Sequence, residues 1–122
     1  MFIYGDSGLG KTHLMHAIGH FILEHNPSKK VLYVPSDVFV SDIVDSIRFG
    51  NATSISKIRE KYRTVDVLMV DDVQFLIGKG STQEEFFNTF NTLDQDHKQI
   101  IVASDRLPQN IKTLQDRIAS RL

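Results

Sequence analysis

The sequence contains no cysteine and no tryptophan, and only three prolines in 122 residues. Without cysteine the chain can form neither a disulfide framework nor a thiolate metal site, and this composition fits a reducing compartment. No apolar run approaches the roughly 20 residues that span a bilayer. The first residues run into a glycine-rich loop and not into a signal-peptide cleavage site. We therefore expect a cytoplasmic protein with no membrane segment.

Neither sign of charge is in excess, because 14 lysines and arginines stand against 15 aspartates and glutamates. Bulk charge therefore predicts no nucleic-acid or membrane partner by itself, and any contact with a polyanion must come from a local group of residues. Internal repeats and low-complexity tracts are also absent. At 122 residues the chain has the size of one domain with a real core.

The most specific signal in the chain is the stretch GDSGLGKT at residues 5–12. It matches the pattern G-x-x-x-x-G-K-[ST] and follows a short apolar segment, Phe2–Tyr4. A helical pattern comes next, in which we expect one apolar face made of Leu14, Met15, Ile18, Phe21 and Ile22. This strand, loop and helix together predict a phosphate-binding loop. A glycine-rich turn that merely joins a strand to a helix is the less favoured interpretation.

Each residue type in this loop has a separate task in holding a triphosphate. We expect Gly5, Gly8 and Gly10 to take positive φ angles and to let the phosphates approach without a Cβ in the way. The helix that starts near Lys11 adds unpaired N–H groups and the positive end of its dipole. Lys11 supplies a cation for the β- and γ-phosphates of ATP, and the Thr12 hydroxyl is a ligand for Mg²⁺.

The rest of the chain alternates apolar runs with amphipathic patterns, which predicts a parallel sheet covered by helices. The runs that predict buried strands after Phe2–Tyr4 are 31–34, 67–70 and 99–103. Two helices are predicted between the second and third strands. The first has an apolar face of Phe39, Ile43 and Ile47 with Val40 and Val44 beside it, and Ser54 is a candidate cap for the second.

A further helix is predicted between the third and fourth strands. Thr82 and Glu85 form a capping-box pattern before the apolar residues Phe86, Phe87, Phe90 and Leu93. We expect these aromatic side chains to belong to the core and not to a surface on which bases stack.

Two carboxylates, Asp71 and Asp72, come directly after the third strand. Side chains at the carboxyl end of a parallel strand lie beside the ligand crevice. We interpret the pair as a Walker B element, in which Asp71 holds Mg²⁺, largely through water, and Asp72 orients or deprotonates the attacking water. The usual second acid is glutamate, and aspartate is one methylene shorter. Solvated acids in an ordinary turn are the other interpretation, which the phosphate loop upstream makes less favourable.

Polar residues also follow the fourth strand. Asp105 stands at its carboxyl end, where it can sense the γ-phosphate or serve as a helix cap or turn residue, and position alone does not separate the two. Arg117 and Arg121 are spaced to share a face of a final helix. In most proteins the arginines of such a pair are solvated or form salt bridges. The more specific hypothesis is that one of them contacts the nucleotide of a neighbouring subunit.

Three histidines, His13, His16 and His20, have a spacing that could place them on one side of the first helix and invite a metal ion. No carboxylate or thiolate accompanies them, and the start of this helix is already assigned to phosphate. We therefore favour ordinary packing and solvation for these imidazoles.

With these residues identified, the chain resembles the AAA+ ATPase domain of the DnaA family, the bacterial chromosomal replication initiators. The resemblance runs almost from end to end, through FIYGDSGLGKTHLMHAIG, KVLYVPSDVF, EKYRTVDVLMVDDVQFLIGK, TQEEFFNTFNTL, KQIIVASDR and LQDRIASRL. It implies an ATP-dependent switch. Subunits with bound ATP would assemble head to tail into a filament on origin DNA and help to open the duplex, and hydrolysis would reset them.

The resemblance also implies roles for individual residues. Catalysis would involve Asp72, Asp105 as the first sensor and Arg121 as an arginine finger in the next protomer. Asp71 and Thr12 would be the Mg²⁺ ligands. The nucleotide-binding residues would be Gly5, Gly8, Leu9, Gly10, Lys11, Thr12, His13 and Arg117. Val44 and Lys79 fall where the family contacts single-stranded DNA, although Gly80-Ser81 replaces a second basic residue that is common after Lys79.

The expected fold class is an α/β three-layer P-loop fold, an AAA+ core with a four-stranded parallel sheet. The family strand order 5-1-4-3-2 implies that the first strand lies at an edge here, since we expect the fifth strand and the helical lid to be missing. Residues 1–122 would then be one partial nucleotide-binding domain with a two-helix initiator-specific insertion at about 37–63. The alternatives are a helicase-loader ATPase of the same clade and a nucleotide-gated binding module without turnover.

Overall fold

The computed structural model describes residues 2–4, 9–48, 50, 52–76 and 80–105 of the chain. Its centre is one sheet of four parallel strands in the order β1-β4-β3-β2. The strands are β1 (Phe2–Tyr4), β2 (Val31–Pro35), β3 (Val67–Asp71) and β4 (Gln99–Ser104). All four predicted strands are confirmed, and so is the relative order that the family resemblance implied for them. Within the described residues, β1 is an edge strand.

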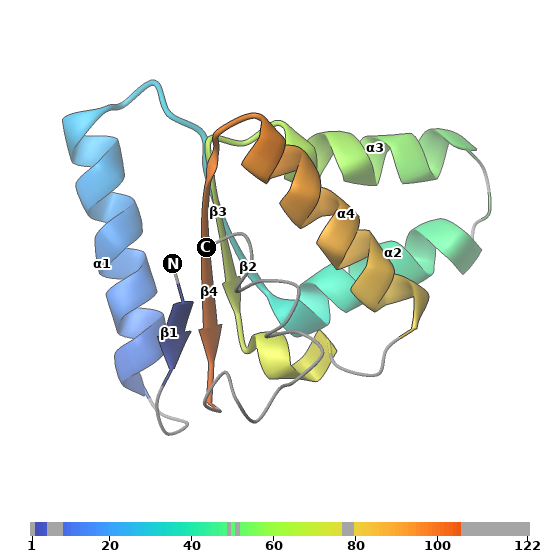
Figure 1. Ribbon diagram of the computed structural model, residues 1–122, viewed down its shortest axis with the longest axis horizontal. Coiled ribbons are helices and arrows are strands. Elements are labelled where there is room, and N and C mark those ends of the chain that lie inside the picture. The colour runs from blue at the N-terminus through green and yellow to red at the C-terminus, as the bar shows by residue number, and fades with distance from the viewer. Residues whose placement is uncertain (1, 5–8, 49, 51, 77–79, 106–122) are drawn as a thin grey trace.

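Helices cover both faces of this sheet, as the sequence predicted. They are α1 (Leu9–His25), α2 (Ser36–Arg48), α3 (Ala52–Arg63) and α4 (Ser81–Gln95), with a short 3₁₀ helix η1 (Val73–Leu76) after β3. Figure 1 shows α1 alone on one face and α2, α3 and α4 together on the other. The result is a three-layer α/β fold. Among the described residues, no helix has both the length and the apolar character needed to cross a bilayer.

The central strands β3 and β4 are almost completely buried, which explains why they are continuous apolar runs in the sequence. The larger core lies between the sheet and α2–α4. Its aromatic centre is Phe39, which meets Tyr62 at 4.9 Å and Phe86 at 5.9 Å between ring centroids. Edge-to-face packing of this kind adds to the stabilisation that comes from buried area. These contacts join the two helices between β2 and β3 to α4.

Ion pairs reinforce the same three helices at their outer surface. Glu85 of α4 accepts hydrogen bonds from Arg63 at 2.8 Å and from Arg59 at 3.1 Å, both of which lie on α3. Asp42 of α2 pairs with Lys61 at 3.1 Å and accepts a hydrogen bond from the hydroxyl of Tyr62. Ion pairs that water reaches stabilise a fold by less than about 1 kcal/mol each, and these are partly exposed, so their main effect is to fix how the helices are oriented.

Both predicted helix caps are wrong. Helix α4 begins at Ser81 with Gly80 as its cap residue, and no side chain there makes a capping hydrogen bond. Gly80 has a φ of 56°, which a glycine adopts without strain. Thr82 is therefore already inside the helix and buried, while Glu85 is engaged by the arginines of α3. Ser54 likewise lies within α3, which begins at Ala52.

The predicted apolar face of α1 is only partly correct. Met15 is fully buried, and Ile18 and Ile22 pack beside it against the sheet. Leu14 and Phe21 are 46% and 61% exposed, because each lies at least about 100° around the helix from Met15. On α2 the same discrepancy affects Ile47, which is 52% exposed, although Phe39 and Ile43 are buried as predicted.

Removal of the central aromatic ring should show how much the core contributes to stability. Phe86 is 1% exposed and contacts Phe39, Phe87 and Phe90. We expect Phe86→Ala to lower the free energy of unfolding by about 3–5 kcal/mol, measured by urea denaturation. The matched control is Phe75→Ala, since Phe75 is 56% exposed and its loss should cost at most about 0.5 kcal/mol. Equal losses in the two variants would contradict this description of the core.

Candidate functional site

The site is built around the first turn of α1, at the edge of the sheet where the parallel strands end. Because α1 begins at Leu9, the residues Gly10, Lys11 and Thr12 all lie in its first turn. The N–H groups of a first turn have no partners within the helix, and the helix dipole makes this end attractive to anions. Lys11 is only 8% exposed. The helix start predicted near Lys11 is confirmed to within two residues.

The positive φ predicted for Gly10 is wrong. Gly10 does not have a positive φ, because the positive-φ glycines among the described residues are Gly50 and Gly80. Gly10 instead has helical geometry, and a Cβ added to it would meet nothing within 4 Å. The space that a close ligand needs is therefore present without backbone strain. Gly5 and Gly8 lie outside the described residues.

Helix α1 is tied to the end of β3 by one short hydrogen bond. The hydroxyl of Thr12 donates to Oδ2 of Asp71 at 2.6 Å. Asp71 is 2% exposed, and its other oxygen, Oδ1, accepts the backbone N–H of Asp72 at 3.0 Å. The two residues predicted to bind Mg²⁺ are distant in the sequence, and the fold brings their oxygen atoms into contact.

This pair has the right chemistry for a hard divalent cation. Mg²⁺ prefers oxygen ligands and is held in proteins by one or two carboxylates together with phosphate oxygens and water. Because the Thr12 hydroxyl donates its hydrogen bond to Asp71, the lone pairs of its oxygen stay available to a metal. Thr12 and Asp71 therefore fit the ion that the sequence predicted.

A third side chain, Tyr33 of β2, reaches the same carboxylate. Its hydroxyl donates to Oδ2 of Asp71 at 2.7 Å. Burial, followed by the hydrogen bond to Asp71, raises the pKa of Tyr33 to about 12, so the hydroxyl keeps its proton at neutral pH. Its ring lies 4.5 Å from the ring of His16 on α1. Tyr33 thus connects β2, α1 and the end of β3.

The second acid, Asp72, follows the last residue of β3 and has an unusual backbone conformation. Its φ is 55°, in the left-handed region of backbone conformation. Residues other than glycine adopt this region infrequently, with Asp and Asn the commonest exceptions. The backbone oxygen of Asp72 accepts a 2.6 Å hydrogen bond from the hydroxyl of Ser36 and a 3.1 Å bond from the N–H of Phe75. These bonds hold the chain in the conformation it adopts directly after the strand, which ends at Asp71.

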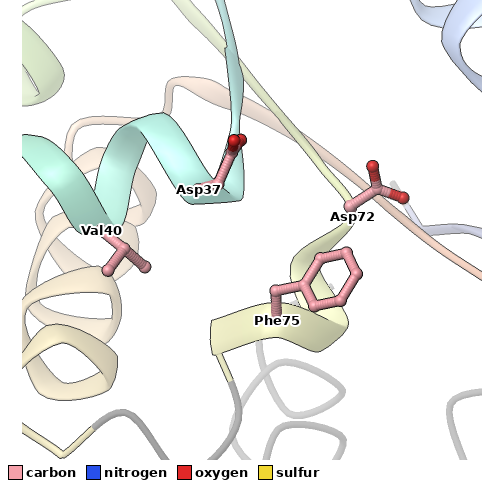
Figure 2. A pocket seen from close by; sticks show the side chains of 4 residues that line it. All are labelled: Asp37, Val40, Asp72 and Phe75. Atoms are coloured by element: carbon pink, nitrogen blue, oxygen red, sulfur yellow. The ribbon is translucent and has the colours of Figure 1, made fainter.

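Asp72 lines an open cavity. The cavity has a volume of about 460 Å³ and is bordered by Asp37 and Val40 of α2, Asp72, and Phe75 of η1. Figure 2 shows these four side chains around the space between α2 and η1. Asp71 is buried beside the Thr12 hydroxyl, whereas Asp72 is one of the residues that line this open space.

Gln74 connects the second acid to the end of β4. Its amide nitrogen donates to Oδ1 of Asp72 at 3.4 Å, and its amide oxygen accepts the backbone N–H of Asp105 at 3.3 Å. Gln74 is 6% exposed. Asp105, the candidate sensor, is therefore linked through Gln74 to Asp72, the second acid of the predicted Walker B pair.

Three residues of this site were not predicted as functional, namely Tyr33, Ser36 and Gln74. Ser36 and Gln74 lie just beyond strand ends, whereas Tyr33 is in the middle of β2 and only its hydroxyl reaches the end of β3. For Tyr33 the available signal was a hydroxyl in an otherwise apolar strand, VLYVP. For Ser36 and Gln74 the signal was only their position beside a strand end, which does not identify a hydrogen-bonding partner.

The remaining predicted residues divide into two groups. Val44 is 41% exposed on α2, and His13 is exposed on α1. Lys79, Arg117 and Arg121 lie outside the described residues, and for Leu9 only the backbone is described. In the described part of the chain, no three His, Cys, Asp or Glu side chains are grouped so that they could hold a metal ion.

Comparisons with known proteins agree with this geometry. Residues 1–122 match the family described as the bacterial DnaA ATPase domain. Over 121 residues the chain is 58% identical to the chromosomal replication initiator protein DnaA of Lachnoclostridium phytofermentans, and this match covers 99% of the chain and 26% of that protein. The chain therefore spans about a quarter of the length of that relative.

Solved structures show the same relationship. Domain III of the replication initiation protein DnaA from Thermotoga maritima superposes with a TM-score of 0.88 at 49% identity, covering 99% of this chain and 50% of that one. A replication initiator DnaA bound to AMPPCP and single-stranded DNA gives a TM-score of 0.86 at 45% identity, covering 99% and 36%. The family match covers the whole sequence, and the identities and the shared fold agree with it: this chain belongs to the bacterial DnaA ATPase domain family.

Proposed function

We propose that the protein containing this chain is a replication initiator that binds ATP with Mg²⁺ and hydrolyses it. It would assemble as an ATP-dependent filament on origin DNA and promote opening of the duplex. The observation that carries the proposal is the 2.6 Å contact between Thr12 and Asp71 at the start of α1. Membership of the family and the similarity to an initiator bound to AMPPCP support it. A cytoplasmic location stays a prediction.

In this proposal the triphosphate binds at the N-terminus of α1. Lys11 is mostly buried in the first turn, so its ammonium would meet the β- and γ-phosphates where little water competes for it. Backbone N–H groups of the loop and of the first turn would bind the remaining phosphate oxygens. The residues that contribute to this binding are Gly5, Gly8, Leu9, Gly10, Lys11, Thr12 and His13.

Thr12 and Asp71 would hold Mg²⁺ beside the phosphates. When bound, the ion would neutralise charge on the β- and γ-phosphate oxygens. Asp71 is buried and accepts three hydrogen bonds, so its position is fixed before any ligand arrives. A ligand that does not have to be reorganised on binding is a common feature of metal sites that bind tightly.

Asp72 would act on the attacking water. Asp72 lines the cavity of Figure 2, and its backbone oxygen accepts a hydrogen bond from Ser36. A carboxylate in that position can orient the water or accept its proton. Asp105, linked to Asp72 through Gln74, would sense the γ-phosphate.

Assembly would complete the site between subunits. We assign Arg121 as the arginine finger that meets ATP on the next protomer, and Arg117 as the second arginine near the nucleotide. A planar guanidinium suits the oxygens of a transferring phosphoryl group. The subunits would then assemble head to tail, because the phosphate loop and the arginine finger of each site come from different subunits.

Single-stranded DNA would lie along the surface that carries Val44 and Lys79. Val44 is well exposed on α2, which with α3 forms the two-helix segment that we assign as the initiator-specific insertion at about 37–63. The buried residues of α2 and α3 pack against α4, and an ion pair also joins α3 to α4. The exposed surface of α2 therefore has a defined orientation. The related initiator bound to single-stranded DNA supports this assignment.

A helicase loader of the same clade is an alternative function on this fold. The 58% identity with an initiator and the match to the initiator family over the whole chain favour initiation. Specific binding of origin DNA by the full-length protein would separate the two, since a loader delivers a helicase without recognising an origin.

A nucleotide-gated module without turnover is an alternative of a different class. It is favoured by one observation, namely that Asp72 stands where a longer glutamate is usual. Such a module would bind ATP and change its partners without releasing phosphate. The difference lies in the chemical step alone, so turnover is the property to measure.

Lys11→Ala tests nucleotide binding. We expect it to weaken ATP binding by the full-length protein roughly 10- to 100-fold, because it removes a charge-assisted hydrogen bond to phosphate. Isothermal titration calorimetry with ATP and Mg²⁺ measures the change. The control is Lys57→Ala, which removes an exposed lysine from α3. Unchanged ATP affinity in Lys11→Ala would exclude the proposed phosphate site.

Asp72→Asn tests the chemical step. We expect phosphate release to fall at least about 100-fold, since general-base catalysis contributes roughly that much, while ATP affinity changes only a few-fold. Phosphate release under single-turnover conditions and ATP binding are measured on the same samples. If the unmodified protein binds ATP and releases no phosphate, the binding-module alternative is correct.

A further inference from the structure

We propose that Tyr33 is a positioning residue for the magnesium site. Its hydroxyl holds the Asp71 carboxylate in the orientation in which the Thr12 hydroxyl also reaches it. This inference rests on the proposed ATP-binding function, because it concerns the ion that accompanies the nucleotide.

The contacts around Asp71 carry the argument. Two hydroxyl donors converge on the same oxygen, Oδ2, from Thr12 at 2.6 Å and from Tyr33 at 2.7 Å. The other oxygen, Oδ1, accepts the N–H of Asp72 at 3.0 Å. Donors on both oxygens fix the rotation of the carboxylate about its Cβ–Cγ bond. Without the Tyr33 hydroxyl, Oδ2 would accept a hydrogen bond from Thr12 alone, and the Thr12 oxygen is itself a proposed metal ligand.

The register of the sheet explains why Tyr33 can do this. Tyr33 of β2 pairs with Met69 of β3, and Asp71 follows Met69 by two residues. Side chains alternate along a strand, so Tyr33, Met69 and Asp71 share the face that α1 covers. The Tyr33 ring packs beside Met69, and its hydroxyl extends toward the end of β3, where Asp71 lies.

The ring of Tyr33 is itself held in place. It lies 4.5 Å from the imidazole of His16 on α1, one turn after Thr12. The hydroxyl therefore reaches Asp71 from β2 while its ring rests on the same helix that presents Thr12. A shift of α1 relative to β3 would disturb both hydrogen bonds to Asp71 together, so Tyr33 couples the phosphate-binding helix to the metal-binding acid.

The expected consequence is a change in metal affinity and not in nucleotide recognition as such. Donors to metal-binding carboxylates set the orientation and basicity of the ligand, and their loss costs about 10- to 100-fold in metal affinity or activity. If Tyr33 served only to fill space, the ring alone would suffice and the hydroxyl could be removed without effect on the metal.

The test compares Tyr33→Phe with Tyr62→Phe in the full-length protein. Both changes remove one hydroxyl that donates to an aspartate, but Tyr62 donates to Asp42 on the opposite face of the sheet. ATP affinity is measured in excess EDTA and across a Mg²⁺ titration, with circular dichroism and thermal unfolding as checks on the fold. For Tyr33→Phe we expect the Mg²⁺ concentration at half-maximal effect to rise about tenfold, with ATP affinity in EDTA within twofold of the unmodified protein.

Tyr62→Phe should change neither quantity. A double variant gives a second measurement, because Tyr33→Phe should cause no further loss of Mg²⁺ dependence when Asp71→Asn is already present. An unchanged Mg²⁺ requirement in folded Tyr33→Phe, an equal rise in Tyr62→Phe, or additive losses in the double variant would each overturn the inference. If the unmodified protein bound no ATP, the proposed function would fail and this inference with it.

Discussion

The hydrogen bond between Thr12 and Asp71 is the contact on which the candidate site depends. It joins the first turn of α1 to the end of β3 at 2.6 Å, although β4 lies between β1 and β3 in the sheet. The contact is possible because parallel strands present all their carboxyl ends at one edge, where α1 also begins. Strand order thereby brings together the helix end and the acid that we propose to bind phosphate and metal, and only local adjustments depend on individual side chains.

Those adjustments give the two neighbouring acids different environments. Asp71 continues the strand, is 2% exposed and is held by Thr12, Tyr33 and the next N–H group. Asp72 leaves the strand at a φ of 55° and lines a cavity. A conformation of that kind persists only where surrounding contacts impose it, and here Ser36 supplies one of them from the first residue of α2. The packing of α2 against α4 therefore supports the site as well as the core.

Much of this arrangement could be predicted from the sequence, and the exceptions have physical reasons. The strands were predictable because buried parallel strands are continuous apolar runs, and the start of α1 because the motif G-x-x-x-x-G-K-[ST] stands at the beginning of a helix. Tyr33 was missed because its target depends on the register of β2 against β3, which no local pattern reveals. The caps at Ser54 and Thr82 were wrong because each helix starts earlier than its polar residue suggested. Leu14 and Phe21 were assigned to a buried face that is narrower than the apolar stripe in the sequence.

The most direct measurement is a crystal structure of the full-length protein with AMPPCP and Mn²⁺, with the ion located by its anomalous scattering. Our account predicts one anomalous peak roughly 2.0–2.3 Å from Oγ1 of Thr12, a typical distance for such ions, on the side where the Asp71 carboxylate lies. The β- and γ-phosphates should lie against the first turn of α1. A triphosphate bound away from that turn, or a metal ion that contacts neither Thr12 nor Asp71 directly or through water, would contradict the central claim.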